Sequence, residues 1–473
     1  MYNLDKEKEI HELVLAQRRY FNTGETLKVS FRIKQLKALK AALISHEDAI
    51  CDALNKDLGR HQVEAYICDV GSVILEANEA IHKLKKWSRT EVHFSGLVCF
   101  PSIFTRVYKM PYGVSLIMSP YNLPFILSLG VLVAAISGGN TAVLKASSKT
   151  PNCTKVLQDL ISETFPPEYI TVLDGGHDVA DMCLNERFDK IFYTGSTNVG
   201  RHVLECASKN LTSVALELGG ENGNWCIVRK DADIKDAARK IAFFKMLNSG
   251  QVCINVNQVA VAKEVADEFI LEFKKAAVSQ IGEHACQNPE YSCLVNDSAY
   301  EKCAREAEEY RDRIVFGGKG CPETRRYSPT LIYPVDINEP IVKHELFNPL
   351  LPVVPFDDDK IEDLLQIIGE REHGLSLYLF TKDVKWAKKT MGRMQFGNGA
   401  INEILLQIIV KGVPFNGTGH SGMGAYHGEW GFREFTHPQT VLIGKRHFNL
   451  PFREHPYIES KLPKYKTLKT LEK

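Results

Sequence analysis

The first part of the chain mixes apolar and charged residues with a helical period. Segments 10–21, 29–59 and 64–87 carry apolar side chains at helical spacing with charges between them. This spacing predicts amphipathic helices over most of this region. Between residues 96 and 108 the pattern changes to β-branched and aromatic residues with Pro101 among them, which predicts an edge ribbon.

A regular alternation of apolar runs and amphipathic segments follows. Strands are predicted at 112–119, 140–146, 169–176, 190–196 and 212–220, with helices between them. A second region of this kind has predicted helices at 233–247 and 264–278 and strands at 258–262, near 353 and near 377. Apolar strands alternating with amphipathic helices predict an α/β fold with a doubly wound parallel sheet. Such a sheet binds ligands at the carboxyl ends of its strands.

The composition excludes several classes of function. Of 473 residues, 44% are hydrophobic and 25% charged, which is typical of a soluble globular protein with a large core. Lys+Arg and Asp+Glu both total 58, so no net charge favours nucleic acid or acidic lipid. The N-terminus is polar and the longest apolar stretch, around 123–137, is too short for a membrane anchor. We expect a cytoplasmic protein.

One of the twelve cysteines has an unusual sequence context. The cysteines are scattered without C-x-x-C spacing, which favours buried reduced thiols, and no His/Cys/Asp cluster has the spacing of a metal site. Cys253, however, lies in NSGQVCINVNQ, after glycine and glutamine and before two asparagines. This context differs from that of a thiol buried among apolar residues.

Three further stretches carry candidate chemistry. FYTGSTNVG places Gly195, Ser196 and Gly200 where a strand passes into a helix, and free backbone N–H groups there attract phosphate; the serine could instead be an ordinary helix cap. Glu217 ends an apolar strand, where a carboxylate needs a cleft or a partner unless it meets solvent. Asn122 follows the first strand, and an ordinary turn asparagine is the alternative.

Seven stretches in order now support a resemblance: SPYNLPF, VLKASS, YTGSTNVG, LELGG, GQVC, HELFNPLLPV and PFNGTGHSGMGAYHG. Together they resemble the aldehyde dehydrogenase superfamily over nearly the whole chain. RFDKIFYTGST and GHSGMGAYHG are most similar to the class 3 branch, which handles fatty and aromatic aldehydes. The resemblance implies NAD(P)-dependent oxidation of a medium- or long-chain aliphatic or an aromatic aldehyde to the carboxylic acid.

The resemblance also implies catalytic roles. Cys253 matches the nucleophile, whose thiolate adds to the aldehyde to give a thiohemiacetal and then a thioester. Asn122 and the backbone N–H of Cys253 match the donors that stabilise the oxyanion. Glu217 matches the base that activates water to hydrolyse the thioester.

Positions for the dinucleotide carry over in the same way. Lys145 matches the lysine that binds the adenine ribose, and Ser196, with Gly195 and Gly200 nearby, matches the serine on the pyrophosphate. Glu345 matches the glutamate on the nicotinamide ribose, and Phe347 packs near that ring. NAD or NADP is therefore the implied cofactor.

Departures from the family pattern raise a question of cofactor choice. Ser148, followed by Lys149, stands where the family commonly has a glutamate that binds the NAD ribose. Loss of that carboxylate removes repulsion of a 2′-phosphate, so we predict that NADP is accepted; loop drift without consequence is the alternative. Glu221 replaces a lysine, and Asn255 and Asn257 replace the usual residues after the nucleophile, with no effect that the sequence defines.

The resemblance divides the chain into parts. We predict a dinucleotide-binding domain at 1–95 and 109–218 and a catalytic domain at 219–400. A small β oligomerisation unit is predicted at 96–108 and 401–446, followed by a tail at 447–473. The class 3 relatives suggest a homodimer.

Alternative functions stay open at this point. An acyl-CoA-forming or acyl-reducing relative would use the same cysteine, although Glu217 disfavours it because a water-activating base would waste the thioester. A thiol hydrolase would act without a dinucleotide. A non-catalytic dinucleotide-binding homologue would bind the cofactor without turnover.

Overall fold

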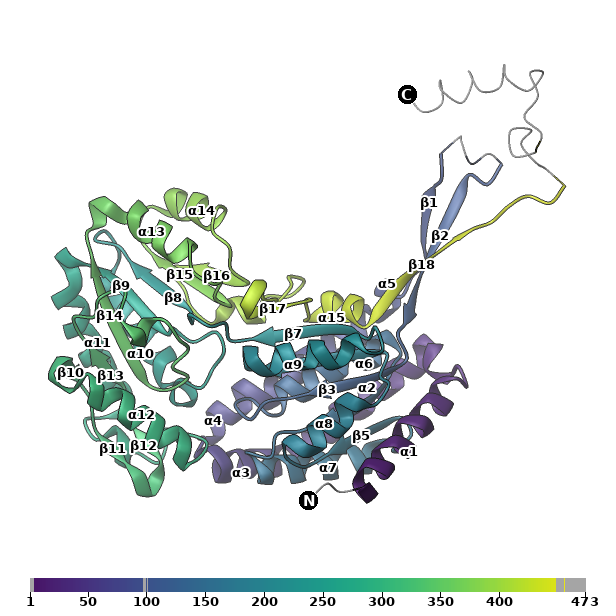
Figure 1. Cartoon of the computed structure of the whole chain (residues 1–473), viewed down its shortest axis with the longest axis horizontal. Helices are drawn as coiled ribbons and strands as arrows, with labels where there is room; N and C mark the ends of the chain where they lie inside the picture. The colour runs from purple at the N-terminus through teal and green to yellow at the C-terminus, as the bar shows by residue number, and fades with distance from the viewer. Residues whose placement is uncertain (1–3, 97–98, 100, 448–454, 456–473) are drawn as a thin grey trace, which may run out of the picture.

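The computed structural model describes residues 4–96, 99, 101–447 and 455. Figure 1 shows two lobes, each built around a sheet, and an arm of three strands that projects from one of them. The predicted tail at 447–473 falls outside the described residues except at its first position and at 455. None of the helices in the described part is long and apolar enough to cross a membrane.

The first lobe contains a six-stranded sheet in the order β17-β7-β6-β3-β4-β5. Its strands are β3 (Val114–Met118), β4 (Thr141–Lys145), β5 (Ile170–Leu173), β6 (Lys190–Gly195), β7 (Ser213–Leu218) and β17 (Gly422–Met423). The first five run parallel, and the short β17, which returns from the C-terminal part of the chain, pairs antiparallel with β7. The predicted doubly wound sheet is thus confirmed, whereas β17 was not predicted.

Helices cover both faces of this sheet. One face carries α1 (Leu4–Phe21), α8 (His177–Asn185) and α9 (Thr197–Ser208). The other carries α2 (Val29–Ser45), α5 (Gly71–Trp87), α6 (Val131–Gly138) and α7 (Pro151–Thr164), with α3 (Glu47–Leu58), α4 (Gln62–Ala65) and α15 (Gly428–Glu434) nearby. Every residue of β3 and β4 is buried, as expected for strands covered on both faces.

The second lobe contains a seven-stranded sheet in the order β10-β13-β14-β9-β8-β15-β16. Its strands are β8 (Trp225–Val228), β9 (Gln258–Ala262), β10 (Ile314–Phe316), β13 (Thr330–Ile332), β14 (Leu350–Phe356), β15 (Ser376–Phe380) and β16 (Asn398–Ile401). Its helices are α10 (Ile234–Met246), α11 (Ala266–Ile281), α12 (Asp297–Glu309), α13 (Ile361–Gly369) and α14 (Val384–Met391), and a two-stranded ribbon, β11 (Gly320–Cys321) with β12 (Arg326–Tyr327), lies beside it. A second α/β lobe was predicted, and its strands are again mainly parallel.

The projecting arm joins distant parts of the sequence. β2 (Phe104–Pro111) pairs antiparallel with β1 (Glu91–Phe94) on one side and with β18 (Thr436–Leu442) on the other. The predicted ribbon range of 96–108 is therefore too narrow: β1 ends before this range begins, and β2 continues beyond it to Pro111.

The topology of the first sheet decides where a ligand can enter. From β3 the chain moves outward to β4 and β5, and then returns to the other side of β3 to form β6 and β7. The strand order reverses between β3 and β6, and parallel sheets bind ligands at the carboxyl ends of strands beside such a reversal. The loop carrying Asn122 follows β3, and the turn carrying Ser196 follows β6.

Candidate active site

The segment that leads to Cys253 has an unusual backbone. After α10 ends, Asn248 (φ 50°), Ser249 (φ 51°) and Gly250 (φ 78°) are left-handed in succession. Such a conformation costs a residue other than glycine about 1–2 kcal/mol. Only a residue without a side chain fits at 250, because a Cβ there would overlap the backbone oxygen of Asn348.

Hydrogen bonds with buried polar side chains hold this strained turn. Asn248 donates through Nδ2 to the carbonyl of Gln251 at 3.0 Å, and Gln251 donates through Nε2 to the carbonyls of Asn248 and Cys293, both at 3.0 Å. Ser249 donates to the carbonyl of Ser292 at 2.5 Å. The amides in NSGQVCINVNQ therefore satisfy backbone groups in a turn that presents the cysteine.

Asn122 reaches the same turn from the other lobe. Its Nδ2 donates to the backbone carbonyl of Gln251 at 3.1 Å, and its backbone carbonyl accepts from Nδ2 of Asn248 at 2.9 Å. Asn122 is 2% exposed. Asn122 thus lies against the turn that leads to Cys253, and its role as an oxyanion donor remains a prediction.

Cys253 is half-buried and is held as a neutral thiol in this state. Burial, together with the nearby carboxyl groups of Glu345 and Glu217, raises the pKa of the thiol to about 12, although the backbone N–H groups of Cys253 and Ile254 act in the opposite direction. A thiol with this pKa needs a base, or a change in its surroundings, to become a nucleophile.

Glu217 lies in the buried end of β7. It is 4% exposed, and among the described residues neither carboxyl oxygen has a hydrogen-bond partner. Burial, with a smaller contribution from the charge of Glu434, raises the pKa of Glu217 well above its usual range. The alternative of a strand-end glutamate facing solvent is therefore wrong. A carboxyl group of high basicity near a thiol is suited to proton transfer.

Glu345 forms the opposite wall of the site. Its carboxyl group fills the space that a side chain at Gly219 would need, which places it close to the end of β7. Burial raises the pKa of Glu345 to about 7, against the opposing charges of Lys302 and Lys245. Lys245 is 1% exposed, and burial lowers its pKa to about 7. No pattern in the sequence indicated this buried lysine beside the site.

The two asparagines after Cys253 have structural partners. Asn257 donates to the carbonyl of His344 at 3.0 Å and accepts from the N–H of Leu346 at 2.7 Å, so it holds the backbone on both sides of Glu345. Asn255 donates to the carbonyl of Phe244 at 2.8 Å.

Asn224 binds the cysteine segment itself. It donates to the carbonyls of Cys253 at 2.7 Å and Asn255 at 2.9 Å, and it accepts from the N–H of Ser376 at 2.7 Å. The nucleophile segment is thereby fixed to the amino-terminal ends of β8 and β15 in the second sheet. Asn224 was not among the predicted site residues.

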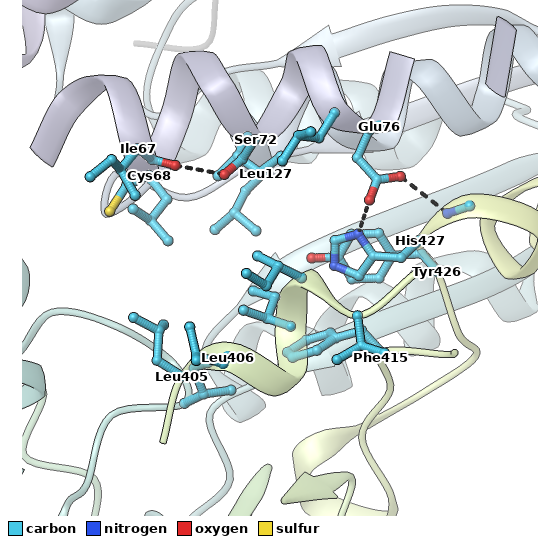
Figure 2. A pocket seen from close by; sticks show the side chains of 18 of the residues that line it. Ile67, Cys68, Ser72, Glu76, Leu127, Leu405, Leu406, Phe415, Tyr426 and His427 are labelled. Atoms are coloured by element: carbon cyan, nitrogen blue, oxygen red, sulfur yellow. Dashed lines mark hydrogen bonds and ion pairs between the residues drawn. The ribbon is translucent and has the colours of Figure 1, made fainter. Parts of the chain in front are cut away.

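An apolar channel leads from the surface to Cys253. Aliphatic and aromatic side chains form most of its wall, including Leu123, Ile126, Leu127, Leu247, Leu405, Ile408 and Phe415. Figure 2 shows the helix with Ser72 and Glu76 on one side and the segment of Leu405 and Leu406 opposite. At the mouth, Ile67 is 62% exposed and Ile409 is 56% exposed.

A polar pair interrupts this wall. Nδ1 of His427 lies 2.7 Å from a carboxyl oxygen of Glu76, whose other oxygen accepts from the N–H of Gly428 at 3.1 Å (Figure 2). Although burial opposes it, hydrogen bonding with His427 lowers the pKa of Glu76. The His427 ring stacks on Tyr426 with ring centroids 4.2 Å apart. Glu76 is thus held as a paired carboxylate within apolar surroundings.

The predicted adenine-side residues lie at the end of β4. Lys145 is 6% exposed and donates to the carbonyls of Ala146 and Gly175, both at 2.7 Å. Ser148 is exposed, and the ammonium of Lys149 lies 5.0 Å from the centre of the Tyr121 ring. Tyr121 in turn contacts Phe347, with ring centroids 6.1 Å apart. Lys145, Ser148 and Tyr121 thus lie at the carboxyl ends of β3 and β4, and Phe347 contacts Tyr121 from the second lobe.

The turn after β6 has an exposed serine at the start of a helix. Ser196 occupies the N-cap position of α9 with an extended backbone, yet its side chain makes no capping hydrogen bond. The explanation of Ser196 as an ordinary helix cap is therefore wrong. Its hydroxyl and the helix N-terminus can both face an anion.

The two glycines of this turn allow close packing within the protein. A Cβ at Gly195 would overlap the hydroxyl of Tyr193, and one at Gly200 would lie 2.9 Å from Cδ2 of Leu218. Gly200 thus lets α9 lie close to β7. Approach of a ligand to these two glycines remains a prediction.

Glu221, whose effect the sequence left undefined, joins two parts of the structure. One carboxyl oxygen lies 2.7 Å from Nη2 of Arg201 in α9, and the other lies 2.8 Å from Nδ1 of His420. Hydrogen bonding to Arg201 lowers the pKa of Glu221. A lysine at this position would face the guanidinium of Arg201 instead of pairing with it.

The fold and these contacts define a class of protein: an α/β dehydrogenase with a cysteine between two lobes. The sequence profile of the "Aldehyde dehydrogenase family" matches residues 2–441. The chain is 37% identical over 434 residues to a 4,4'-diaponeurosporen-aldehyde dehydrogenase of Staphylococcus aureus, covering 92% of this chain and 94% of that protein. It is 33% identical to an "Aldehyde dehydrogenase, dimeric NADP-preferring" of Canis lupus familiaris, covering 92% of this chain and 94% of that protein.

A comparison of structures agrees. The chain superposes with a TM-score of 0.93 and 35% identity on a structure described as the substrate-bound state of Staphylococcus aureus AldH, covering 98% of this chain and 99% of that one. The chain belongs to the aldehyde dehydrogenase family. It is an NAD(P)-dependent aldehyde dehydrogenase, and its relatives include proteins named as family 3 members, as the sequence motifs predicted.

Proposed function

We propose that Cys253 is the nucleophile of this aldehyde dehydrogenase. The observation that carries the proposal is its location: the thiol lies at the inner end of an apolar channel, with Asn122 beside its loop and the carboxyl groups of Glu217 and Glu345 nearby. A reachable thiol, an amide donor and a base are the groups that aldehyde oxidation through a thioester requires.

The first step forms a bond between Sγ of Cys253 and the aldehyde carbon. The thiol proton is lost to solvent as this bond forms, so this step does not require Glu217. The carbonyl oxygen becomes an oxyanion, which Nδ2 of Asn122 and the N–H of Cys253 stabilise by donating hydrogen bonds. Removal of one such donor typically slows a reaction by about 10²–10³-fold.

The second stage converts the thiohemiacetal into the acid. The dinucleotide, when bound, supplies the acceptor for the hydride, and a thioester on Cys253 results. Glu217 then takes a proton from water, whose oxygen attacks the thioester carbon. The bond between that carbon and Sγ breaks, so Cys253 leaves as a thiolate and the carboxylic acid is released. Burial without a hydrogen-bond partner raises the basicity of this carboxyl, which suits it to take the proton from water.

The residues at the edge of the first sheet fit a dinucleotide. Lys145 can hold the adenine ribose, and Ser196, whose side chain does not cap α9, can hold the pyrophosphate. Glu345 and Phe347 can hold the nicotinamide side. We propose that NADP is accepted, because Ser148 brings no negative charge to the ribose site. The dog and rat relatives named as NADP-preferring support this proposal.

The substrate is proposed to be an aldehyde with a long apolar chain, aliphatic or aromatic. The mainly apolar wall of the channel and the exposed apolar side chains of Ile67 and Ile409 at its mouth support this class. Burial of each methylene stabilises a complex by about 0.8 kcal/mol, so KM should fall about fourfold with each added carbon until the channel is filled.

A homodimer is proposed through the projecting arm. β18 pairs on one side with β2, and within the described residues its other edge has no strand partner. The arm exposes large apolar side chains, with Val92 60%, Phe94 64% and Phe104 56% exposed. An open edge and an apolar surface support association with a second copy. A cytoplasmic location stays a prediction.

A panel of aldehydes from three to fourteen carbons, with benzaldehyde, tests the proposed activity with NAD and with NADP. We expect the acid as product, the highest kcat/KM for the long chains, and no turnover by Cys253→Ala despite normal dinucleotide binding. Acyl-CoA formed on addition of coenzyme A would support the acyl-CoA-forming alternative instead. Dinucleotide binding without turnover of any aldehyde would support the non-catalytic alternative.

A further inference from the structure

A buried arginine outside the predicted site connects its two essential loops. Arg60 follows α3, where Gly59 (φ 61°) ends the helix and Asn55 donates to the carbonyl of Arg60 at 3.1 Å. The side chain of Arg60 is 0% exposed. An arginine without access to water must be held by partners that repay the cost of burying its charge.

Two of these partners, Asn122 itself and Asp69, hold the loop of Asn122. Nη2 of Arg60 donates to the carbonyl of Asn122 at 2.6 Å. Nη1 lies 2.5 Å from Oδ2 of Asp69, whose other oxygen accepts from the N–H groups of Phe125 and Ile126, both at 2.9 Å. Arg60 and Asp69 together therefore fix the backbone of this loop at three points.

The third partner, Glu64 of α4, holds the nucleophile loop. Nε of Arg60 lies 3.4 Å from Oε1 of Glu64, and the same oxygen accepts from the N–H of Asn248 and from the hydroxyl of Ser292, both at 3.0 Å. Asn248 is the first of the left-handed residues that lead to Cys253. The guanidinium thus binds the Asn122 loop directly through the backbone carbonyl of Asn122. It is linked to the nucleophile loop through the carboxylate of Glu64.

We infer that Arg60 is a positioning residue, which sets the amide of Asn122 relative to the sulfur of Cys253. This inference rests on the proposed role of Asn122 as an oxyanion donor. The donor must lie within a few tenths of an ångström of its place, since an error of 1 Å can cost about 10²-fold in rate. A guanidinium suits this task because its donors have a fixed planar geometry, which a lysine cannot reproduce.

A double-mutant cycle tests the inference. Arg60→Lys should lower kcat for aldehyde oxidation by about 10²-fold. KM for the dinucleotide should stay within about twofold, because its partners lie at the other loops. In an Asn122→Ala background, the same Arg60→Lys change should cost no more than about threefold, because the group that Arg60 positions is already missing.

A second variant covers the case in which Arg60→Lys does not fold. Glu64→Gln keeps an oxygen for Asn248 and Ser292 but removes the charge that faces Arg60, and the side chain of Glu64 is 17% exposed, so its replacement is less disruptive. The same coupling to Asn122→Ala is expected. Arg32→Lys is the matched control: Arg32 is also buried, but it binds the carbonyls of Thr26, Leu27 and Ser137, and its cost should be equal in both backgrounds.

The two possible failures are distinct. If Asn122→Ala alone keeps nearly full activity, the proposed oxyanion role fails. If Asn122→Ala is impaired but Arg60→Lys and Glu64→Gln each cost the same factor with and without it, the oxyanion role stands and the positioning role of Arg60 is overturned.

Discussion

Replacing Glu217 by glutamine should stabilise the protein while impairing it as an enzyme. Glu217 lies in β7 with both oxygens buried and without hydrogen-bond partners among the described residues. In the unfolded chain this carboxyl ionises with a pKa near 4.5, whereas burial raises its pKa well above that value in the folded protein. Above pH 4.5, folding must therefore take up a proton or bury a charge, and both destabilise the folded state.

The magnitude follows from linkage. A difference of one unit between the folded and unfolded pKa corresponds to about 1.4 kcal/mol. The free energy of unfolding contributed by Glu217 thus falls by about 1.4 kcal/mol per pH unit, from the unfolded pKa up to the folded pKa. Glutamine is neutral at every pH and has the same shape. The advantage of Glu217→Gln should be small at pH 5 and should grow with rising pH, by at most about 1.4 kcal/mol per unit, until the folded pKa of Glu217 is reached.

Urea unfolding of both proteins between pH 5 and pH 8, at one protein concentration and without dinucleotide, measures this difference. A control, Glu434→Gln, tests whether the nearby second carboxylate accounts for the effect, since its charge also raises the pKa of Glu217. A stability difference that stays constant with pH would refute the reasoning, because it would mean that Glu217 ionises in the folded protein as readily as in the unfolded chain.

Three further experiments test other parts of the site. Without dinucleotide, alkylation of Cys253 by iodoacetamide, followed by peptide mass mapping, should accelerate about tenfold per pH unit from pH 7 to pH 10, because its pKa is about 12; a plateau near pH 8 would contradict this. Ser148→Glu should raise KM for NADP relative to NAD by about tenfold or more, through repulsion of the 2′-phosphate, and an unchanged ratio would refute the NADP proposal. Leu127→Trp should narrow the channel and raise KM for dodecanal about tenfold, but leave KM for propanal unchanged. Equal effects on both KM values would mean that the alkyl chain of the substrate does not bind in this channel.

The sequence predicts those features that have a local signal. The strands of the first sheet are continuous apolar runs, such as Val114–Met118, because both of their faces are covered by helices. Cys253 differed from the other cysteines in its sequence context, because glycine and amide residues stand nearby in place of apolar ones. The structure shows why: three left-handed residues lead to it, and the polar groups of this turn need partners.

Features that depend on long-range packing had no such signal. Arg60 and Asn122 are 62 positions apart, and nothing in the hydrophobic pattern indicates that one binds the carbonyl of the other. The walls of the channel come from segments as distant as Ile67 and Ile409. Glu221 was visible only as a departure from a pattern, and its meaning required the positions of Arg201 and His420.

The central claim is that Cys253 carries the acyl group of the substrate. Glu217→Gln mixed with dodecanal and NADP should reduce one equivalent of dinucleotide rapidly and then slow down, because hydrolysis lacks its base. Acid quenching and mass spectrometry of the peptides should show the mass of a dodecanoyl group on the peptide that contains Cys253, and none after Cys253→Ala. Reduction of the dinucleotide without an acyl group on that peptide, or with the group on another cysteine, would contradict the account.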